Sequence, residues 1–213
     1  MPNMNIPTLR RLPRYLKALV VLSGVGQKYV TSAEMAGILK LDETLVRKDI
    51  AMTGFTGKPR VGFAITELRN HLEDFLGLRI RKDAIVIGAG RLGQALTCYH
   101  GFEPHGLRVV GLFDNDPVKM GMRVNELEIM PLWQAPALAK RLNVSIAIIA
   151  VPANAAQEVA DNLFKVGLTA FWNFSGHPIK MPPPAVVQNE DLADSLAVFS
   201  YEVVRNLKMD EKV

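Results

Sequence analysis

The chain has 213 residues, of which 49% are hydrophobic and 22% are charged, and its formal net charge is +4. This composition excludes an intrinsically disordered chain and leaves enough residues for two packed domains. The single cysteine excludes an internal disulfide bond, and no apolar run approaches the length that crosses a bilayer.

Two further expectations concern the compartment. Since Arg10, Arg11 and Arg14 interrupt the start of the chain, we expect no signal peptide. The lone thiol, Cys98, favours a reducing cytoplasm, and we expect it to be a small buried hydrophobe within a helix.

The charge is divided unevenly along the chain. Residues 1–82 hold 14 lysines and arginines against 7 aspartates and glutamates, whereas residues 83–213 hold 11 against 14. A basic small domain indicates a polyanionic partner, although a solvated basic face gives the same count.

The first apolar residues recur at helical spacing and predict a helix closed by Gly24 and Gly26. They are Leu9, Leu12, Leu16, Leu19 and Val20, with Tyr15 beside them. Pro13 is tolerable only near the start of such a helix. Thr31 to Glu34 form a capping-box pattern that predicts a helix through Leu39. Asp42 is placed to cap a following helix from Glu43 to about Met52.

Two short helices joined by a three-residue turn are typical of a helix-turn-helix. Leu45, Val46 and Ile50 would pack the second helix inward and leave its polar residues exposed. Glycines flank the basic segment 54–63 and predict a β-hairpin wing. We expect contacts with double-stranded DNA from Ser32, Thr44, Arg47, Lys48, Lys58 and Arg60. A winged helix that binds protein is the alternative.

The most informative pattern lies between Asp83 and Asp114. An apolar run leads into Gly88-Ala89-Gly90-Arg91-Leu92-Gly93, which fits G-x-G-x-x-G, and a helical pattern follows. A second apolar run ends at Asp114, 21 residues beyond Gly93. In a dinucleotide-binding fold the glycines allow a tight turn, close approach of a pyrophosphate and close packing of helix on strand, and the acid accepts the ribose hydroxyls. A strand-to-helix turn without a ligand is the alternative.

The residues after Asp114 indicate which dinucleotide is bound. They are Asn115, Asp116 and Pro117, and the next basic residue is Lys119. A 2′-phosphate would meet negative charge here, so NAD(H) is favoured over NADP(H).

Apolar strands and helices alternate through the rest of the chain. Helices are predicted over 66–75, 133–142 and 153–166, and buried strands over 145–151 and 168–174. This predicts an α/β protein with a winged helix-turn-helix domain (1–80), a Rossmann-like doubly wound parallel sheet (81–190) and a C-terminal helix (191–213).

Ligands of such sheets lie at the carboxyl ends of the strands. We therefore expect NAD(H) to contact Gly88, Ala89, Gly90, Arg91, Leu92, Gly93, Asp114, Val151, Pro152, Asn173 and Phe174. The final helix carries an apolar face made of Leu192, Leu196, Phe199, Val203 and Leu207. This face could cover its own subunit or a partner.

The whole pattern resembles the Rex family of redox-sensing transcriptional repressors, which are bacterial NADH/NAD⁺ sensors. The motifs that carry the resemblance are Arg11-Leu12-Pro13, Val46-Arg47-Lys48-Asp49-Ile50, the glycine fingerprint, Phe113-Asp114-Asn115-Asp116-Pro117, Val151-Pro152-Ala153-Asn154-Ala155-Ala156-Gln157 and Asn189-Glu190-Asp191-Leu192-Ala193. The resemblance implies a homodimer that binds operator DNA and is released by NADH, with its C-terminal helix inserted between the two domains of the other subunit. It also implies coupling between the domains through Lys17, Tyr99 and Asp191.

The sequence departs from the family pattern in three places. The recognition helix ends Ala51-Met52-Thr53-Gly54, where the family has Ser-Tyr-Phe-Gly. The wing reads Lys58-Pro59-Arg60-Val61-Gly62-Phe63 against Lys-Arg-Gly-Val-Gly-Tyr, and the strand-end motif reads Asn173-Phe174-Ser175-Gly176 against Asn-Phe-Ala-Pro. These departures bear on the operator sequence and on the nicotinamide contacts.

An NAD-dependent oxidoreductase with an accessory N-terminal domain is the alternative function. Such an enzyme needs a proton donor or acceptor near the nicotinamide. His100 and His105 are expected near the end of the helix that follows the fingerprint, and His177 lies in a connector. Little chain remains for a substrate domain, so we expect no catalytic residue and no metal site.

Overall fold

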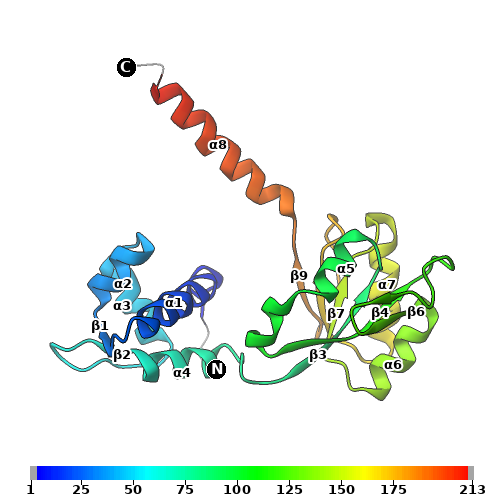
Figure 1. Ribbon diagram of the computed structural model, residues 1–213, viewed down its shortest axis with the longest axis horizontal. Coiled ribbons are helices and arrows are strands. Elements are labelled where there is room, and N and C mark those ends of the chain that lie inside the picture. Colours follow the sequence, from blue (N-terminus) through cyan, green and yellow to red (C-terminus); the bar gives the residue numbers. More distant parts are fainter. Residues whose placement is uncertain (1–3, 211–213) are drawn as a thin grey trace. The chain divides into compact units, whose positions relative to one another are not determined.

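The computed structural model describes residues 4–210 and divides between Ile80 and Arg81 into two compact units (Figure 1). The first unit contains α1 (Ile6–Gly24), β1 (Tyr29–Val30), α2 (Ser32–Leu39), α3 (Glu43–Met52), β2 (Phe63–Ala64) and α4 (Ile65–Phe75). The short strands β1 and β2 pair in antiparallel fashion, with Val30 opposite Phe63.

Local sequence sets the starts of α2 and α3. Thr31 Oγ1 accepts a hydrogen bond from the Glu34 amide at 3.1 Å, and the Glu34 carboxylate accepts one from the Thr31 amide at 2.7 Å. Asp42 Oδ1 accepts a hydrogen bond from the Leu45 amide at 3.0 Å. Each cap pairs an amide that the start of a helix leaves without a partner. The predicted helices 32–39 and 43–52 are therefore confirmed.

Helix α1 begins earlier than the sequence pattern indicated. Asn5 caps it by accepting a hydrogen bond from the Thr8 amide at 2.8 Å, and Pro7 lies in the first turn. Pro13 is therefore inside the helix, and its expected position near the start is wrong. The core of this unit includes Leu12, Tyr15, Leu16, Leu19, Val46, Ile50, Leu68 and Leu72. Two apolar residues assigned to the helical pattern, Leu9 and Val20, are 37% and 55% exposed.

The segment after α3 forms a reduced version of the predicted hairpin. Lys58 and Gly62 make a single antiparallel bridge, in which the Lys58 amide donates to the Gly62 carbonyl at 2.8 Å and the Gly62 amide donates back at 3.0 Å. Arg60 lies at the tip with a φ of +63°, which is uncommon for a residue other than glycine. The segment that follows Gly62 continues into β2, which pairs with β1.

The second unit is built on one seven-stranded sheet. Its elements are β3 (Lys82–Ile87), α5 (Arg91–Thr97), the 3₁₀ helix η1 (His100–His105), β4 (Leu107–Asp114), β5 (Arg123–Val124), β6 (Leu127–Pro131), the 3₁₀ helix η2 (Leu132–Gln134), α6 (Ala135–Arg141), β7 (Ile146–Ile149), α7 (Ala153–Lys165), β8 (Ala170–Asn173), β9 (Val186–Asn189) and α8 (Leu192–Asp210). The strand order is β5-β6-β4-β3-β7-β8-β9, and every pair is parallel except β5 with β6.

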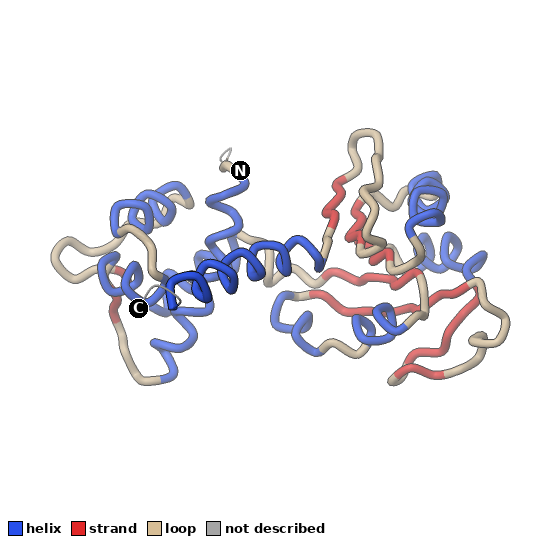
Figure 2. The backbone as a smooth tube through the Cα atoms, turned by 90° about the horizontal axis from the view of Figure 1, so that it is seen from above, coloured by secondary structure: helices blue, strands red, loops and turns tan. Residues whose placement is uncertain are grey.

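Helices cover both faces of this sheet (Figure 2), as expected for a doubly wound fold. Successive residues of a strand point to opposite faces. In β3, Ile85 and Ile87 therefore pack against residues of α6 and α7, whereas Ala84 and Val86 pack in a second cluster with Leu96 and Phe102 of α5 and η1. After β3 the chain adds β4 and β6 on one side, and it then crosses to add β7, β8 and β9 on the other side. Folds of this kind bind their ligands at this switch in strand order, between β3 and β7.

The structure differs from the predicted elements in several places. Helix α5 ends at Thr97, so Cys98 lies at its C-cap and is exposed, and its expected burial within the helix is wrong. His100 and His105 lie in η1 and not in α5. Strands β1, β5, β6 and β9 were not predicted, and β9 follows the proline-rich segment 178–184.

Helix α8 confirms the predicted C-terminal helix, and its apolar side chains are solvent-exposed. Leu196 and Phe199 are each 62% exposed and Leu207 is 60% exposed. Among residues 4–210, the structure contains no helix with the length and hydropathy needed to span a bilayer.

Candidate functional site

The glycine fingerprint forms a turn in which each glycine has its own steric reason. Gly88 has a φ of +102°, and a Cβ there would collide with the carbonyl oxygen of Ala150. A Cβ on Gly93 would collide with the carbonyl oxygen of Gly88, so this glycine allows the helix to approach the strand. A Cβ on Gly90 would meet no atom within 4 Å. The space in front of Gly90 is therefore open to a ligand rather than filled by the protein.

A cavity of about 550 Å³ lies at the carboxyl ends of the central strands, beside this turn. It brings together seven of the predicted cofactor-binding residues, Gly88, Gly90, Arg91, Leu92, Asp114, Val151 and Pro152. Ala89 and Gly93 belong to the turn but are buried beneath it and do not line the cavity. We call this space the dinucleotide cavity.

Asp114 holds the turn through its carboxylate. Its Oδ2 accepts hydrogen bonds from the Ala89 amide at 2.7 Å and from Lys119 Nζ at 3.1 Å, and its Oδ1 accepts one from the Asp116 amide at 2.8 Å. A carboxylate has about four acceptor positions, so one remains for a ribose hydroxyl. Burial opposes the charged form, but the amides of Asp116 and Ala89 and the Lys119 ammonium outweigh it and lower the pKa of Asp114.

Lys119 changes the electrostatic argument for NAD(H). The sequence places it five residues after Asp114, but its ammonium folds back onto Asp114 and lies 3.7 Å from the Asp116 carboxylate. The cavity therefore presents two carboxylates together with one cation. A 2′-phosphate would still meet a net negative charge, so NAD(H) remains favoured, but Lys119 makes this charge smaller than the order of residues in the chain suggests.

Asn173 and Phe174 do not line the dinucleotide cavity. The Asn173 amide donates hydrogen bonds to the His177 carbonyl and to Asn189 Oδ1, each at 2.8 Å, and is 1% exposed. Phe174 packs with Trp172, with ring centroids 5.0 Å apart. These contacts occupy both side chains, so the predicted nicotinamide contacts are not part of the cavity as it stands.

The remaining lining residues were not predicted from the sequence. They are Ile87, Asn115, Asp116, Lys119, Leu132, Ala150, Ala155 and Val159. The signal for Asn115 and Asp116 was their position directly after Asp114. An adjoining apolar cavity of about 620 Å³ shares Asn115, Leu132 and Val159 and has Trp133 among its other lining residues.

A second groove of about 570 Å³ lies in the first unit, between the start of α2, the side of α3 and the wing. Four predicted DNA-binding residues line it, namely Ser32, Arg47, Lys58 and Arg60. The Ser32 hydroxyl donates to Glu43 at 2.9 Å, and the Lys58 ammonium lies 5.7 Å from the centroid of the Tyr29 ring. Thr44 and Lys48 are exposed on α3 outside this groove.

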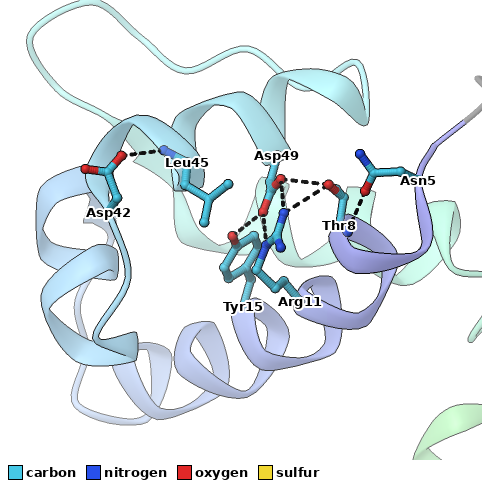
Figure 3. A network of polar contacts seen from close by, with 7 residues as sticks. All are labelled: Asn5, Thr8, Arg11, Tyr15, Asp42, Leu45 and Asp49. Atoms are coloured by element: carbon cyan, nitrogen blue, oxygen red, sulfur yellow. Dashed lines mark hydrogen bonds and ion pairs between the residues drawn. The ribbon is translucent and has the colours of Figure 1, made fainter.

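The side of α3 that faces α1 carries an ion pair between the buried Asp49 and the partly buried Arg11 (Figure 3). Asp49 is 2% exposed and accepts four hydrogen bonds from α1. Arg11 donates from Nε at 2.6 Å and from Nη2 at 2.8 Å, while the Tyr15 hydroxyl donates at 2.6 Å and the Thr8 hydroxyl at 3.0 Å. These donors outweigh burial and lower the pKa of Asp49. The bonds to Asp49 raise the pKa of Arg11, and burial together with Asp49 raises that of Tyr15.

The sequence did contain a signal for this network. Thr8, Arg11 and Tyr15 are spaced three and four residues apart on one side of a helix. Asp49 falls between Val46 and Ile50, which face inward. A carboxylate on the buried side of one helix and a guanidinium on the buried side of another indicate a pair, because a lone buried charge is too unfavourable.

The predicted coupling residues are accessible within the single chain. Lys17 is exposed on α1, and Tyr99 is 59% exposed and packs edge-on against Phe102. Asp191 accepts a hydrogen bond from the Ala193 amide at 2.8 Å. Their proposed contacts stay predictions. Within residues 4–210, no group of three or more histidine, cysteine or acidic side chains is arranged to hold a metal ion.

A helix-turn-helix with a basic wing, followed by a parallel sheet with a glycine-lined cavity, defines a class of two-unit protein that joins a nucleic-acid-binding fold to a dinucleotide-binding fold. Two family models match accordingly. "Putative DNA-binding protein N-terminus" matches residues 5–51, and "CoA binding domain" matches residues 80–177.

The chain belongs to the Rex family. The redox-sensing transcriptional repressor Rex of Treponema denticola is 38% identical over 95% of each chain, and that of Carboxydothermus hydrogenoformans is 38% identical over 97% of this chain and 100% of its own. Among solved structures, the Rex-family repressor RSP with β-NAD⁺ and operator DNA is 31% identical, with a TM-score of 0.91 over 99% of this chain and 97% of its own. RSP with β-NADH gives 30% identity and a TM-score of 0.88, covering 99% and 98%.

Proposed function

We propose that this protein is a redox-sensing transcriptional repressor that binds operator DNA as a homodimer and releases it when NADH occupies the second unit. One observation carries the proposal: the same chain contains a basic helix-turn-helix groove and, beside Asp114, an open space in front of Gly90. The names of the relatives and the ligands of RSP support it.

In this proposal α3 is the recognition helix. Thr44, Arg47 and Lys48 would enter the major groove, and Lys58 and Arg60 of the wing would contact the backbone or an adjacent groove. Ser32, at the start of α2, would contact a phosphate. Arginine is suited to guanine because its planar fork matches two acceptors on that base.

NAD(H) would lie in the dinucleotide cavity. Gly90 leaves the space that a pyrophosphate needs, and Asp114 keeps one acceptor position for the adenosine ribose. Val151 and Pro152 also line the cavity, and we expect the nicotinamide beside them. The fit of the residues to a dinucleotide rests on the open space in front of Gly90 and on the lowered pKa of Asp114, which keeps its carboxylate ionised and able to accept hydrogen bonds.

The exposed apolar face of α8 supports the proposed homodimer. A helix that exposes Leu196, Phe199 and Leu207 on one stripe presents an apolar surface that a partner is expected to cover. We propose that a second copy of the chain does so, since most assemblies of one chain are symmetric dimers. A cytoplasmic location is part of the same proposal.

The experiment that tests the function is a titration of an operator fragment at fixed salt, with and without NADH. We expect tight binding with NAD⁺ or no ligand and weaker binding with NADH. DNA affinity that does not change with NADH would contradict the sensor. The oxidoreductase alternative gains no support from the relatives, which are named as repressors. It would be revived by turnover of NADH with any member of a panel of carbonyl substrates.

A further inference from the structure

We propose that Asp49 and Arg11 are positioning residues that fix the rotation of the recognition helix α3 about its own axis. The inference rests on the proposed DNA-binding function and names the contact that gives this function its sequence specificity. Neither residue lines the groove beside the wing, so their action on DNA would be through α3.

Helix geometry shows which way α3 is turned. At 3.6 residues per turn, Val46, Asp49 and Ile50 fall on one side of the helix, and all three are at most 2% exposed. Thr44, Lys48 and Ala51 fall on the opposite side and are exposed, while Arg47 lies between the two sides and faces the groove. The side that holds Asp49 therefore determines where the proposed DNA-binding side chains point.

Apolar packing alone would hold this rotation loosely. Contacts of Val46 and Ile50 are non-directional and tolerate small changes of angle. A turn of ~20° would move a side-chain tip ~6 Å from the axis by ~2 Å. Hydrogen bonds to base edges tolerate only a few tenths of an ångström, so a rotation of this size would remove them.

The contacts of Asp49 are directional. Arg11 meets it through two parallel bonds of 2.6 and 2.8 Å, the planar geometry that guanidinium and carboxylate share. Tyr15 and Thr8 fill the remaining acceptor positions from one turn on either side. Arg11 Nη2 also donates to the Thr8 hydroxyl at 3.0 Å. Figure 3 shows all three α1 side chains converging on the one carboxylate.

Stability alone does not account for such a network. A buried ion pair can often be replaced by apolar side chains of similar volume without loss of stability, because desolvation offsets the attraction between the charges. Such a replacement would keep the fold but would remove the directional hydrogen bonds that fix the rotation of α3. A variant of this kind therefore separates a positioning role from a structural one.

The test uses the full chain and two duplexes of equal length and composition. One is the sequence that the wild-type protein selects from a random pool, and the other is a scrambled version of it. The variant is Arg11→Met with Tyr15→Phe and Asp49→Leu. The matched control is Glu73→Leu with Arg79→Met, which removes the more exposed ion pair of these two residues and their contacts with Arg69 and Asp74 in the same unit, also without changing net charge.

We expect the triple variant to melt cooperatively and to bind the scrambled duplex with the wild-type affinity and salt dependence. Its preference for the selected duplex should fall by about tenfold or more, comparable to one or two mismatched base pairs. The control should keep the wild-type preference. A triple variant that keeps the preference, or that loses affinity for both duplexes equally, would overturn the positioning role.

Tyr15→Phe alone guards against misfolding of the triple variant, because it removes one hydroxyl and little volume. We expect it to lower the same preference by about threefold, the effect of losing a single hydrogen bond. An unchanged preference in this variant would also overturn the inference. A wild-type chain that selects no sequence from the pool would instead contradict the proposed function.

Discussion

Lys119 and Asp114 form an ion pair in the lining of the dinucleotide cavity, with Nζ 3.1 Å from Oδ2. The lysine side chain is 33% exposed and the aspartate 8%. Because the ammonium neutralises part of the carboxylate charge, the cavity distinguishes a ribose hydroxyl from a 2′-phosphate less strongly than the order of residues in the chain suggests.

The first prediction therefore concerns cofactor preference. In Lys119→Met the 2′-phosphate would meet Asp114 and Asp116 without a cation, so the preference for NADH over NADPH should widen by about fivefold, the effect expected of one partly exposed charge pair. Asp114→Ala should weaken NADH binding and narrow the preference. Isothermal titration of both dinucleotides checks this. Equal affinity of the wild-type protein for the two would contradict NAD(H) specificity.

A second prediction concerns the open space at Gly90. Gly90→Val would place a branched side chain where the pyrophosphate must lie, so NADH binding should be lost while the protein still folds. Gly37→Val is the matched control, since a Cβ on Gly37 also meets nothing within 4 Å but lies in the first unit. NADH fluorescence reports the binding. Retained affinity in Gly90→Val would place the pyrophosphate elsewhere.

A third prediction concerns the recognition helix. Arg47→Ala should weaken operator binding by ~1–3 kcal/mol if the side chain makes a bidentate base contact. Lys48→Ala should lower the slope of affinity against salt by about one if it contacts a phosphate. NADH affinity should not change in either variant. Lys140→Ala, at an exposed site of α6, removes the same charge and should leave DNA binding unchanged. Wild-type DNA affinity in both α3 variants would exclude α3 as the reading element.

The ion pair of Asp49 predicts a pH dependence of stability. Its pKa is lowered in the folded protein, so its contribution is present above the ordinary aspartate pKa and is lost as the pH falls through the folded value. The wild-type protein should have a larger free energy of unfolding than Asp49→Asn. This difference should be constant near neutral pH and should shrink as the pH falls below ~4. Urea unfolding followed by circular dichroism measures it. A difference that grows on acidification would reverse the sign of the argument.

The last prediction concerns the coupling of the two ligands. A sensor needs two states that NADH and DNA bind unequally, and the effect is reciprocal. We predict that Asp191 pairs with Lys17 in the DNA-binding state and with Tyr99 when that contact is released. Asp191→Ala should then lower the ratio of operator affinities with NAD⁺ and NADH, which for a coupling of ~1–3 kcal/mol lies between about 5 and 150 in the wild type. Asp194→Ala serves as the control. An unchanged ratio in Asp191→Ala would remove this residue from the switch.

The sequence predicted elements well where a local signal exists. Thr31, Glu34 and Asp42 satisfy helix-start amides within four residues, so the bounds of α2 and α3 could be read directly. The glycine turn was also local. Strands β1 and β5 have two residues each, too few for a period to be visible, and they depend on pairing partners elsewhere in the chain.

The site could be predicted only in part because its electrostatics depend on contacts after folding. Lys119 reaches Asp114 only because the loop after β4 turns back, as the Asp116 amide bond to Asp114 shows. Likewise, Asn173 lies at the predicted strand end, but β9, which no pattern indicated, provides Asn189 to engage its side chain.

The positions of the two tryptophans have a practical consequence. Both Trp133 and Trp172 belong to the second unit, the former beside the cavity that adjoins the dinucleotide site and the latter in β8, and residues 1–80 have none. Intrinsic indole emission therefore reports on one half of the protein without any label. Because reduced nicotinamide absorbs where indole emits, quenching of this emission would follow occupancy by NADH.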